Sequence, residues 1–140
     1  MSEIKVDTLT GKTTTKDITV TVGATATQSL EQGLAKAWAS IDADATDHPT
    51  LDAFNIASTA DIATGVTKIT FTNGFSNSFY AVSGAGQAQD EAGGIFGMWG
   101  RSTTNSRQMT SSDFHTDNRA SDSSARDLIY FGMSVHGDLA

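Results

Sequence analysis

Hydrophobic and polar residues alternate in two short stretches near the start of the chain. Ile4 and Val6 alternate with polar neighbours, and Ile18, Val20 and Val22 resume the same period after a break rich in Thr, Gly and Lys. A period of two is typical of half-buried β-strands, so this arm predicts a hairpin or a pair of edge strands. Two strands bury too little apolar surface to be stable alone in water. They must therefore pack on the rest of the chain or on another subunit.

The period changes after this arm. Leu30, Leu34 and Trp38 recur at helical spacing, and Thr25 and Gln28 have the spacing of a capping box. This pattern predicts an amphipathic helix of about three turns. Its apolar face has two interpretations: it covers a core within the chain, or it forms the contact between identical helices of a short symmetric bundle.

Short alternating stretches separated by turn residues follow in the rest of the chain. The alternating apolar positions are Phe54 and Ile56, Ile69 and Phe71, Tyr80 and Val82, and finally Ile129, Phe131, Met133 and Val135. Short strands with frequent turns are typical of a compact β-sandwich. The sequence thus predicts a mainly β protein, in which an N-terminal β-strand arm and short helix (residues 1–39) precede an antiparallel β-sandwich (residues 40–140).

Many of these positions resemble a module of phage virion proteins. The segment AKAWASID, followed by LDAFNIASTADIATGVTKITFTNGFSNSFYAVSGAG, is similar to a module of tail-fibre and other virion proteins, especially in phages of marine bacteria. The matching residues are Trp38, Phe54, Asn55, Ile56, Lys68, Ile69, Thr70, Phe71, Phe75, Tyr80 and Val82. The opening IKVDTLTGKTT also resembles the attachment ends of such proteins. The loop ADATDHPTLD replaces the usual Gly/Thr-rich turn, and the resemblance ends at Gln87.

The resemblance implies a virion structural protein that is made in the host cytoplasm and carried on the tail or capsid surface. One interpretation is a small trimeric tail fibre or tail-tip component, which docks on another virion protein through its arm and displays the β domain for host attachment. The alternative is a capsid decoration or head-fibre protein held on the major capsid lattice by the same arm. In both, the expected docking and oligomerisation residues are Ile4, Val6, Ile18, Val20, Val22, Leu30, Leu34 and Trp38.

Composition narrows the classes of partner. The chain has 140 residues, no cysteine and a formal net charge of -7. Excess negative charge disfavours nucleic-acid binding, because Lys and Arg contacts to phosphate dominate that affinity. The first thirty residues carry no long apolar run, so neither a signal peptide nor membrane insertion is expected.

All four arginines lie in the most polar stretch, between residues 101 and 126. One interpretation is a pair of solvated loops that only connect strands. The other is an exposed tip that contacts a host glycan, a host protein or a neighbouring virion protein, since Arg and aromatic side chains are common anchors at recognition surfaces. The candidate contact residues of that tip are Arg101, Arg107, Phe114, His115 and Arg119.

The sequence gives little support for a catalytic or metal-binding motif. Asp47 and His48 are adjacent and serines abound, but the G-x-S-x-G elbow of a serine hydrolase is absent from the sequence. The acidic run from Asp42 to Asp52 has Asp47 and Ala53 where a calcium-binding EF-hand needs Gly and Glu, although a looser cation site there stays open. The expected protein is therefore not an enzyme and has no catalytic residues, resident metal or cofactor.

Overall fold

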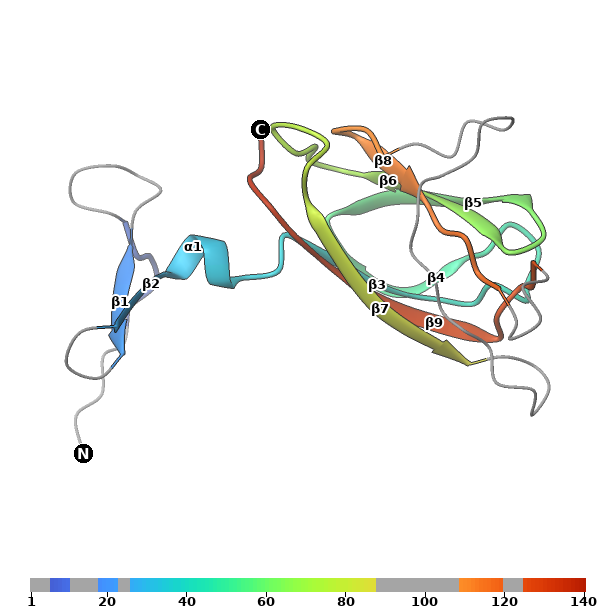
Figure 1. Cartoon of the computed structure of the whole chain (residues 1–140), viewed down its shortest axis with the longest axis horizontal. Coiled ribbons are helices and arrows are strands. Elements are labelled where there is room, and N and C mark those ends of the chain that lie inside the picture. Colours follow the sequence, from blue (N-terminus) through green and yellow to red (C-terminus); the bar gives the residue numbers. More distant parts are fainter. Residues whose placement is uncertain (1–5, 11–17, 23–25, 88–108, 120–124) are drawn as a thin grey trace. The chain divides into compact units, whose positions relative to one another are not determined.

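The computed structural model describes residues 6–10, 18–22, 26–87, 109–119 and 125–140 (Figure 1). The chain divides into two compact units, Met1–Leu34 and Ala35–Ala140. The predicted boundary after residue 39 falls inside a strand of the second unit, β3 (Ala37–Ile41). Strands predominate in both units, and the single helix in the described part spans four residues, too few to cross a membrane.

The N-terminal unit is a small hairpin followed by one helical turn. Strand β1 (Thr19–Val22) pairs antiparallel with β2 (Ala26–Ser29), and α1 (Leu30–Gly33) follows directly. The amide of Leu30 donates to the carbonyl of Ile18 at 2.7 Å, which fastens the start of the helix to the hairpin.

Two predictions for this unit were wrong. The partner of β1 is the segment that follows it, whereas Val6 lies outside any strand and Ile4 lies outside the described residues. Pairing adjacent segments closes a shorter loop and so costs less chain entropy. The three-turn helix is reduced to a single turn: Gln28 belongs to a strand, Thr25 is not described, and Gly33 ends the helix. Glycine weakens helices because it loses the most backbone entropy on folding.

The C-terminal unit contains two antiparallel sheets. The first has four strands in the order β4 (Thr50–Phe54), β3, β9 (Tyr130–His136) and β7 (Ala81–Gln87). The second has three strands in the order β5 (Ile56–Ala63), β6 (Val66–Phe71) and β8 (Asp113–His115). Figure 1 shows the two sheets as separate layers, with β3, β7 and β9 on one side and β5, β6 and β8 on the other.

One apolar core lies between these layers. The four-stranded sheet contributes the inward residues of its two central strands, and the three-stranded sheet contributes Ile69, Phe71 and Phe114. The inward residues of β3 and β9 are Ala37, Ala39, Ile41, Phe131, Met133 and Val135, all buried. Alternation along these two strands therefore divides each into a core-facing and an outward-facing set.

The chain passes from one sheet to the other at Asn55. This residue has a positive φ of 60°, a conformation that Asn tolerates better than most residues. Its side-chain amide donates to the carbonyls of Lys36 and Asn73, and its side-chain oxygen accepts from the amide of Asn73 at 2.7 Å. The predicted alternation of Phe54 with Ile56 is thus divided between two strands of different sheets.

An aromatic cluster fills one end of the core. The rings of Phe75 and Tyr80 stack with centroids 4.5 Å apart, and Phe71 meets Phe75 edge-on at 4.9 Å. The Tyr80 hydroxyl donates to the carbonyl of Asp113 at 3.1 Å. Burial raises the pKa of Tyr80 far above its usual range, and the negative charge of Asp113 raises this pKa further.

The raised pKa of Tyr80 predicts a loss of stability in alkali. The folded state holds the neutral phenol, so this contribution is complete below the unfolded pKa of about 10 and is lost as the pH rises above it. Tyr80→Phe should lower the free energy of unfolding by about 1 kcal/mol at pH 8, because the bond to Asp113 is lost. The difference from wild type should shrink above pH 10 in urea titrations. Parallel pH profiles for the two proteins would contradict this account.

Candidate functional site

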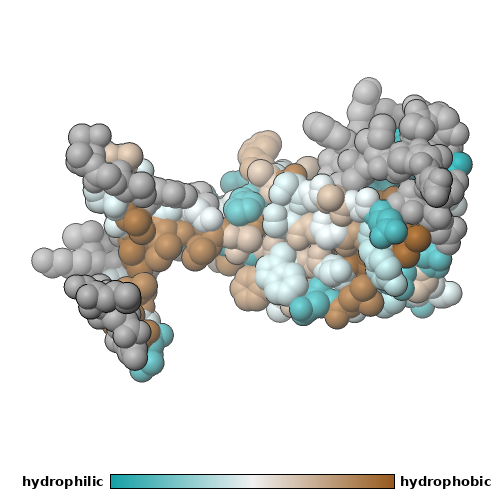
Figure 2. Space-filling model, turned by 90° about the horizontal axis from the view of Figure 1, so that it is seen from below, coloured by the Kyte–Doolittle hydropathy of each residue, from teal (hydrophilic) through white to brown (hydrophobic). Residues whose placement is uncertain are grey.

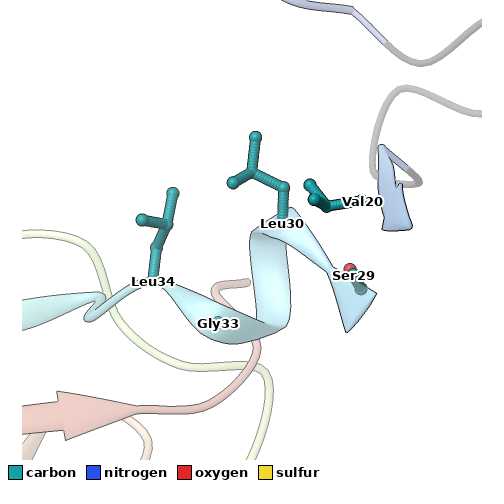
Figure 3. Close-up of a pocket in the computed structure, with 5 residues that line it drawn as sticks. All are labelled: Val20, Ser29, Leu30, Gly33 and Leu34. Atoms are coloured by element: carbon teal, nitrogen blue, oxygen red, sulfur yellow. The ribbon is translucent and has the colours of Figure 1, made fainter. Parts of the chain in front are cut away.

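The N-terminal unit carries an apolar hollow of about 200 Å³. It is lined by Val20, Ser29, Leu30, Gly33 and Leu34 (Figure 3). Leu30 and Leu34 are four residues apart and point to the same side of the helical turn. Val20 and Leu34 are 42% and 54% exposed, so the unit leaves much of its own apolar surface uncovered.

The other predicted docking residues are distributed differently. Ile18 is half-buried, and the backbone of Val22 pairs with Ala26, while Val6 is 55% exposed. Trp38 lies on strand β3 of the C-terminal unit, so the prediction that it shares a helical face with Leu30 and Leu34 was wrong. The pairing of β3 with β9 and β4 explains this change, since it satisfies the backbone of Ala37–Ile41 in extended form.

The predicted exposed tip is contradicted at two residues. Phe114 and His115 are only 2% and 8% exposed, because β8 pairs with β6 and turns Phe114 onto the core beside Phe71. The half-exposed Arg119 has its Nε 3.1 Å from Oδ1 of Asp117. Arg101 and Arg107 lie outside the described residues. A run of polar neighbours had suggested exposure, but pairing along a three-residue strand buries this segment.

Polar side chains of mixed exposure lie around the buried His48. Nδ1 of His48 lies 2.7 Å from Oγ1 of Thr67, while Nε2 lies 3.7 Å from Asp61 and 3.9 Å from Asp127. Asp127 also accepts a hydrogen bond from the amide of Gly65 at 2.6 Å. The sequence shows Asp47 beside His48, but the carboxylates nearest to the ring come from distant positions that only folding brings together.

The cluster fixes a loop and offers no exposed nucleophile. His48 is 2% exposed and Thr67 is fully buried, so an external substrate cannot reach the hydroxyl. Asp47 and His48 both have positive φ values, and the loop before them is closed by Asp42, whose carboxylate accepts from the amides of Asp44 and Ala45. Side-chain bonds of this kind hold turns in conformations that the backbone alone would not keep. Within the described ranges, the His, Asp and Glu side chains form no group of three arranged for a metal ion.

The outer face of the four-stranded sheet presents a second exposed surface. Trp38, Phe54 and Tyr130 are 38%, 53% and 46% exposed. Trp38 lies directly opposite Phe54 across β3 and β4. Figure 2 views the molecule from the side of this sheet and shows a mosaic of pale, teal and brown patches over the C-terminal unit. The sequence signal for this surface is the alternation along β3. It turns Trp38 to the face opposite to that of Ala37 and Ala39.

Comparisons with protein-family models, curated proteins and solved structures found no match to this chain.

The arrangement around His48 predicts a structural role for Thr67. Thr67→Val should leave Nδ1 of His48 buried without this partner and lower the free energy of unfolding by about 1–3 kcal/mol. The matched control is Thr70→Val on the same strand, where the side chain is half-buried and faces the other side. That change should stay within about 0.5 kcal/mol. Equal effects of the two substitutions in urea unfolding would show that the His48 contact contributes nothing.

Proposed function

We propose that this protein is a bacteriophage virion structural protein, a small trimeric tail fibre or tail-tip component. The N-terminal unit docks on another virion protein and joins the copies, and the C-terminal unit is a compact β-sandwich displayed for host attachment. The observation that carries this proposal is the division of the chain into a large unit with its own core and a small unit with an uncovered apolar hollow.

The small unit needs a partner to be stable. A two-stranded hairpin and a single helical turn bury too little apolar surface to fold alone in water. Val20, Leu30 and Leu34 together supply the apolar surface that a partner would remove from water, at about 25 cal/mol per Å². Most soluble oligomers are closed symmetric assemblies of identical chains, and the proposed number of three copies follows the resemblance to tail fibres.

The resemblance to phage virion modules supports the same proposal. The residues that carry the resemblance lie in the framework of the C-terminal unit. Trp38 and Phe54 form a cross-strand pair, and Asn55 makes the crossing between sheets. Phe71 and Tyr80 meet in the aromatic cluster with centroids 5.6 Å apart. The similar residues thus describe the framework of a β unit, which is the part of such proteins that a shared module would preserve.

A structural role fits the polar cluster around His48 better than catalysis does. The hydroxyl beside His48 is fully buried, and its surroundings hold a loop in place. We therefore assign no catalytic residue and no cofactor. The proposed location is the virion, after synthesis in the host cytoplasm.

Charge placed in the apolar hollow should dissociate the oligomer. Leu30→Asp with Leu34→Asp would bury unpaired carboxylates at the proposed contact, which is strongly unfavourable. We expect light scattering to report a trimer for wild type and a monomer for the double variant. Leu51→Asp is the matched control, because Leu51 is a similarly exposed leucine of the other unit, at 57%, and should leave the mass unchanged. A double variant with wild-type mass would place oligomerisation elsewhere.

Removal of residues 1–34 should abolish incorporation into phage particles. All strands of the C-terminal unit are retained, so the shortened chain should remain soluble and show β circular dichroism, yet be absent from immunoblots of purified particles. Normal incorporation would refute the docking role of the N-terminal unit. Cryo-electron microscopy of wild-type particles then distinguishes trimers on the tail from copies spread over the capsid lattice, as the decoration alternative requires.

A further inference from the structure

The turn after β6 contains a dipeptide that is chemically reactive. Asn73 is followed by Gly74, and no other asparagine of the chain has a glycine after it. Asparagine is a thermolabile residue, because the backbone nitrogen of the next residue can attack its side-chain carbonyl carbon. A side chain on that next residue hinders the attack, whereas glycine has no Cβ. The sequence therefore singles out Asn73 among the asparagines.

The structure leaves the reacting groups of this turn available. Asn73 is exposed and Gly74 is half-buried, so water reaches the Asn73 side chain. Among the described residues, none accepts the amide hydrogen of Gly74, although Asn73 and Phe75 on either side both donate theirs. An amide hydrogen outside a hydrogen bond is lost to solvent more readily than one held in a bond. The Gly74 nitrogen is thus the nucleophile that this segment leaves unoccupied.

The fold requires glycine at this position. A Cβ on Gly74 would lie 2.9 Å from the carbonyl oxygen of Ser111, closer than real Cβ atoms approach. The segment is also fastened there, because Phe75 donates its amide to the carbonyl of Ser111 at 2.6 Å, and Gly74 accepts from the amide of Ala140 at 3.0 Å. The reactive dipeptide therefore belongs to the framework of the C-terminal unit, and a larger residue after Asn73 would displace that framework.

We propose that Asn73 is a site of spontaneous deamidation, in which water converts its side chain to a carboxylate and releases ammonia. The Gly74 nitrogen gives its proton to solvent and attacks Cγ of Asn73. Nδ2 takes a proton from water and leaves as ammonia, and a succinimide ring closes. Water then opens this ring at one of its two carbonyls. The proposal is independent of the proposed virion role.

Ring opening gives two products. When the bond between Cγ of Asn73 and the Gly74 nitrogen breaks, residue 73 becomes aspartate and the main chain is restored. When the bond between the backbone carbonyl carbon and that nitrogen breaks, the product is isoaspartate, whose main chain is longer by one methylene group. Both products carry one more negative charge than the original chain.

Either product disturbs the crossing between the two sheets. Oδ1 of Asn55 accepts from the backbone amide and from the side chain of Asn73, at 2.7 and 3.1 Å. A carboxylate has no hydrogen to donate and brings a negative oxygen towards this acceptor. Asn55 cannot turn its amide over in compensation, because its Nδ2 already donates to the carbonyls of Lys36 and Asn73. Deamidation thus removes a hydrogen bond and adds a repulsion.

The isoaspartate product also affects the core. Its extra methylene group shifts the backbone that positions Phe75, which is 2% exposed and stacks on Tyr80 with centroids 4.5 Å apart. Closely packed interiors do not absorb such a shift without losing contacts. The isoaspartate form should therefore be less stable than the aspartate form.

Mass spectrometry of the folded, full-length protein, kept in mildly alkaline buffer without denaturant, tests this proposal. Trypsin releases residues 69–101 as one peptide, which contains both Asn73 and Asn77. We expect this peptide to gain the mass difference between an amide NH2 and a hydroxyl group, with fragmentation placing the gain at Asn73. A more acidic band should grow in isoelectric focusing at the same rate, and an isoaspartyl methyltransferase should label that fraction.

Asn77 is the matched control within the same peptide. It is exposed like Asn73, but it precedes Ser78, and its Oδ1 accepts from the amide of Phe79 at 2.8 Å. It should stay unmodified over the period in which Asn73 reacts. Two variants complete the test: Asn73→Gln should not form the acidic band, and Asn73→Asp should unfold at a lower urea concentration than wild type, as the aspartate fraction does.

Three results would overturn the site: reaction of Asn77 as fast as Asn73, reaction of Asn73 only in urea, or an acidic band that persists in Asn73→Gln. The second result would show that the fold holds the side chain away from the Gly74 nitrogen. An Asn73→Asp protein that unfolds like wild type would refute the effect on the Asn55 contact.

Discussion

The C-terminal unit depends on the pairing of β9 with both β3 and β7. This strand lies near the end of the chain, yet it is central in the four-stranded sheet, and its inward residues Phe131, Met133 and Val135 are all buried. Without β9, the strands β3 and β7 would have no partner on that side, and the core would lose its largest contribution from this layer. Because the pairing joins distant parts of the chain, its loop-closure entropy must be met before these contacts form. Loss of this pairing would therefore disrupt the four-stranded sheet and the core together.

Side chains alternate strictly between the two faces of a strand, and this has a consequence for the outer face of the sheet. Every residue of β3 or β9 that faces the core leaves its neighbour facing outward, so the sequence of the outer face is free of the packing that governs the inner one. Large aromatic side chains on a free face gain nothing from the core. Trp38 and Phe54 lie opposite each other across β3 and β4, and a cross-strand aromatic pair of this kind stabilises the sheet by about 0.2–1 kcal/mol.

Sequence alone was informative where one strand contributes one face. The final run predicted Ile129, Phe131, Met133 and Val135 on a common face. The structure confirms the last three as core residues and the mainly β character of the chain. Ile129 precedes β9 and is only half-buried, and Leu128 is buried in the core in its place. Sequence-based prediction failed where the structure of a segment depends on a strand or side chain that is distant in the sequence. Helical spacing from Leu30 to Trp38 was real, but pairing of Ala37–Ile41 with β9 prevailed over it. Polar neighbours likewise concealed the burial of Phe114 and His115, and no local pattern could bring His48 beside Thr67, Asp61 and Asp127.

The two uncovered surfaces differ in chemistry, and the difference bears on what each can bind. The hollow around Leu30 and Leu34 is lined mostly by apolar groups, so association through it would be driven by removal of apolar area from water and would carry little directional information. That suits a contact with identical copies, where symmetry supplies the geometry. The outer face of the four-stranded sheet carries the aromatic pair of Trp38 and Phe54 beside the hydroxyl pair of Ser83 and Ser134, so it combines apolar rings with polar groups. The apolar hollow and this mixed face belong to separate units of the chain.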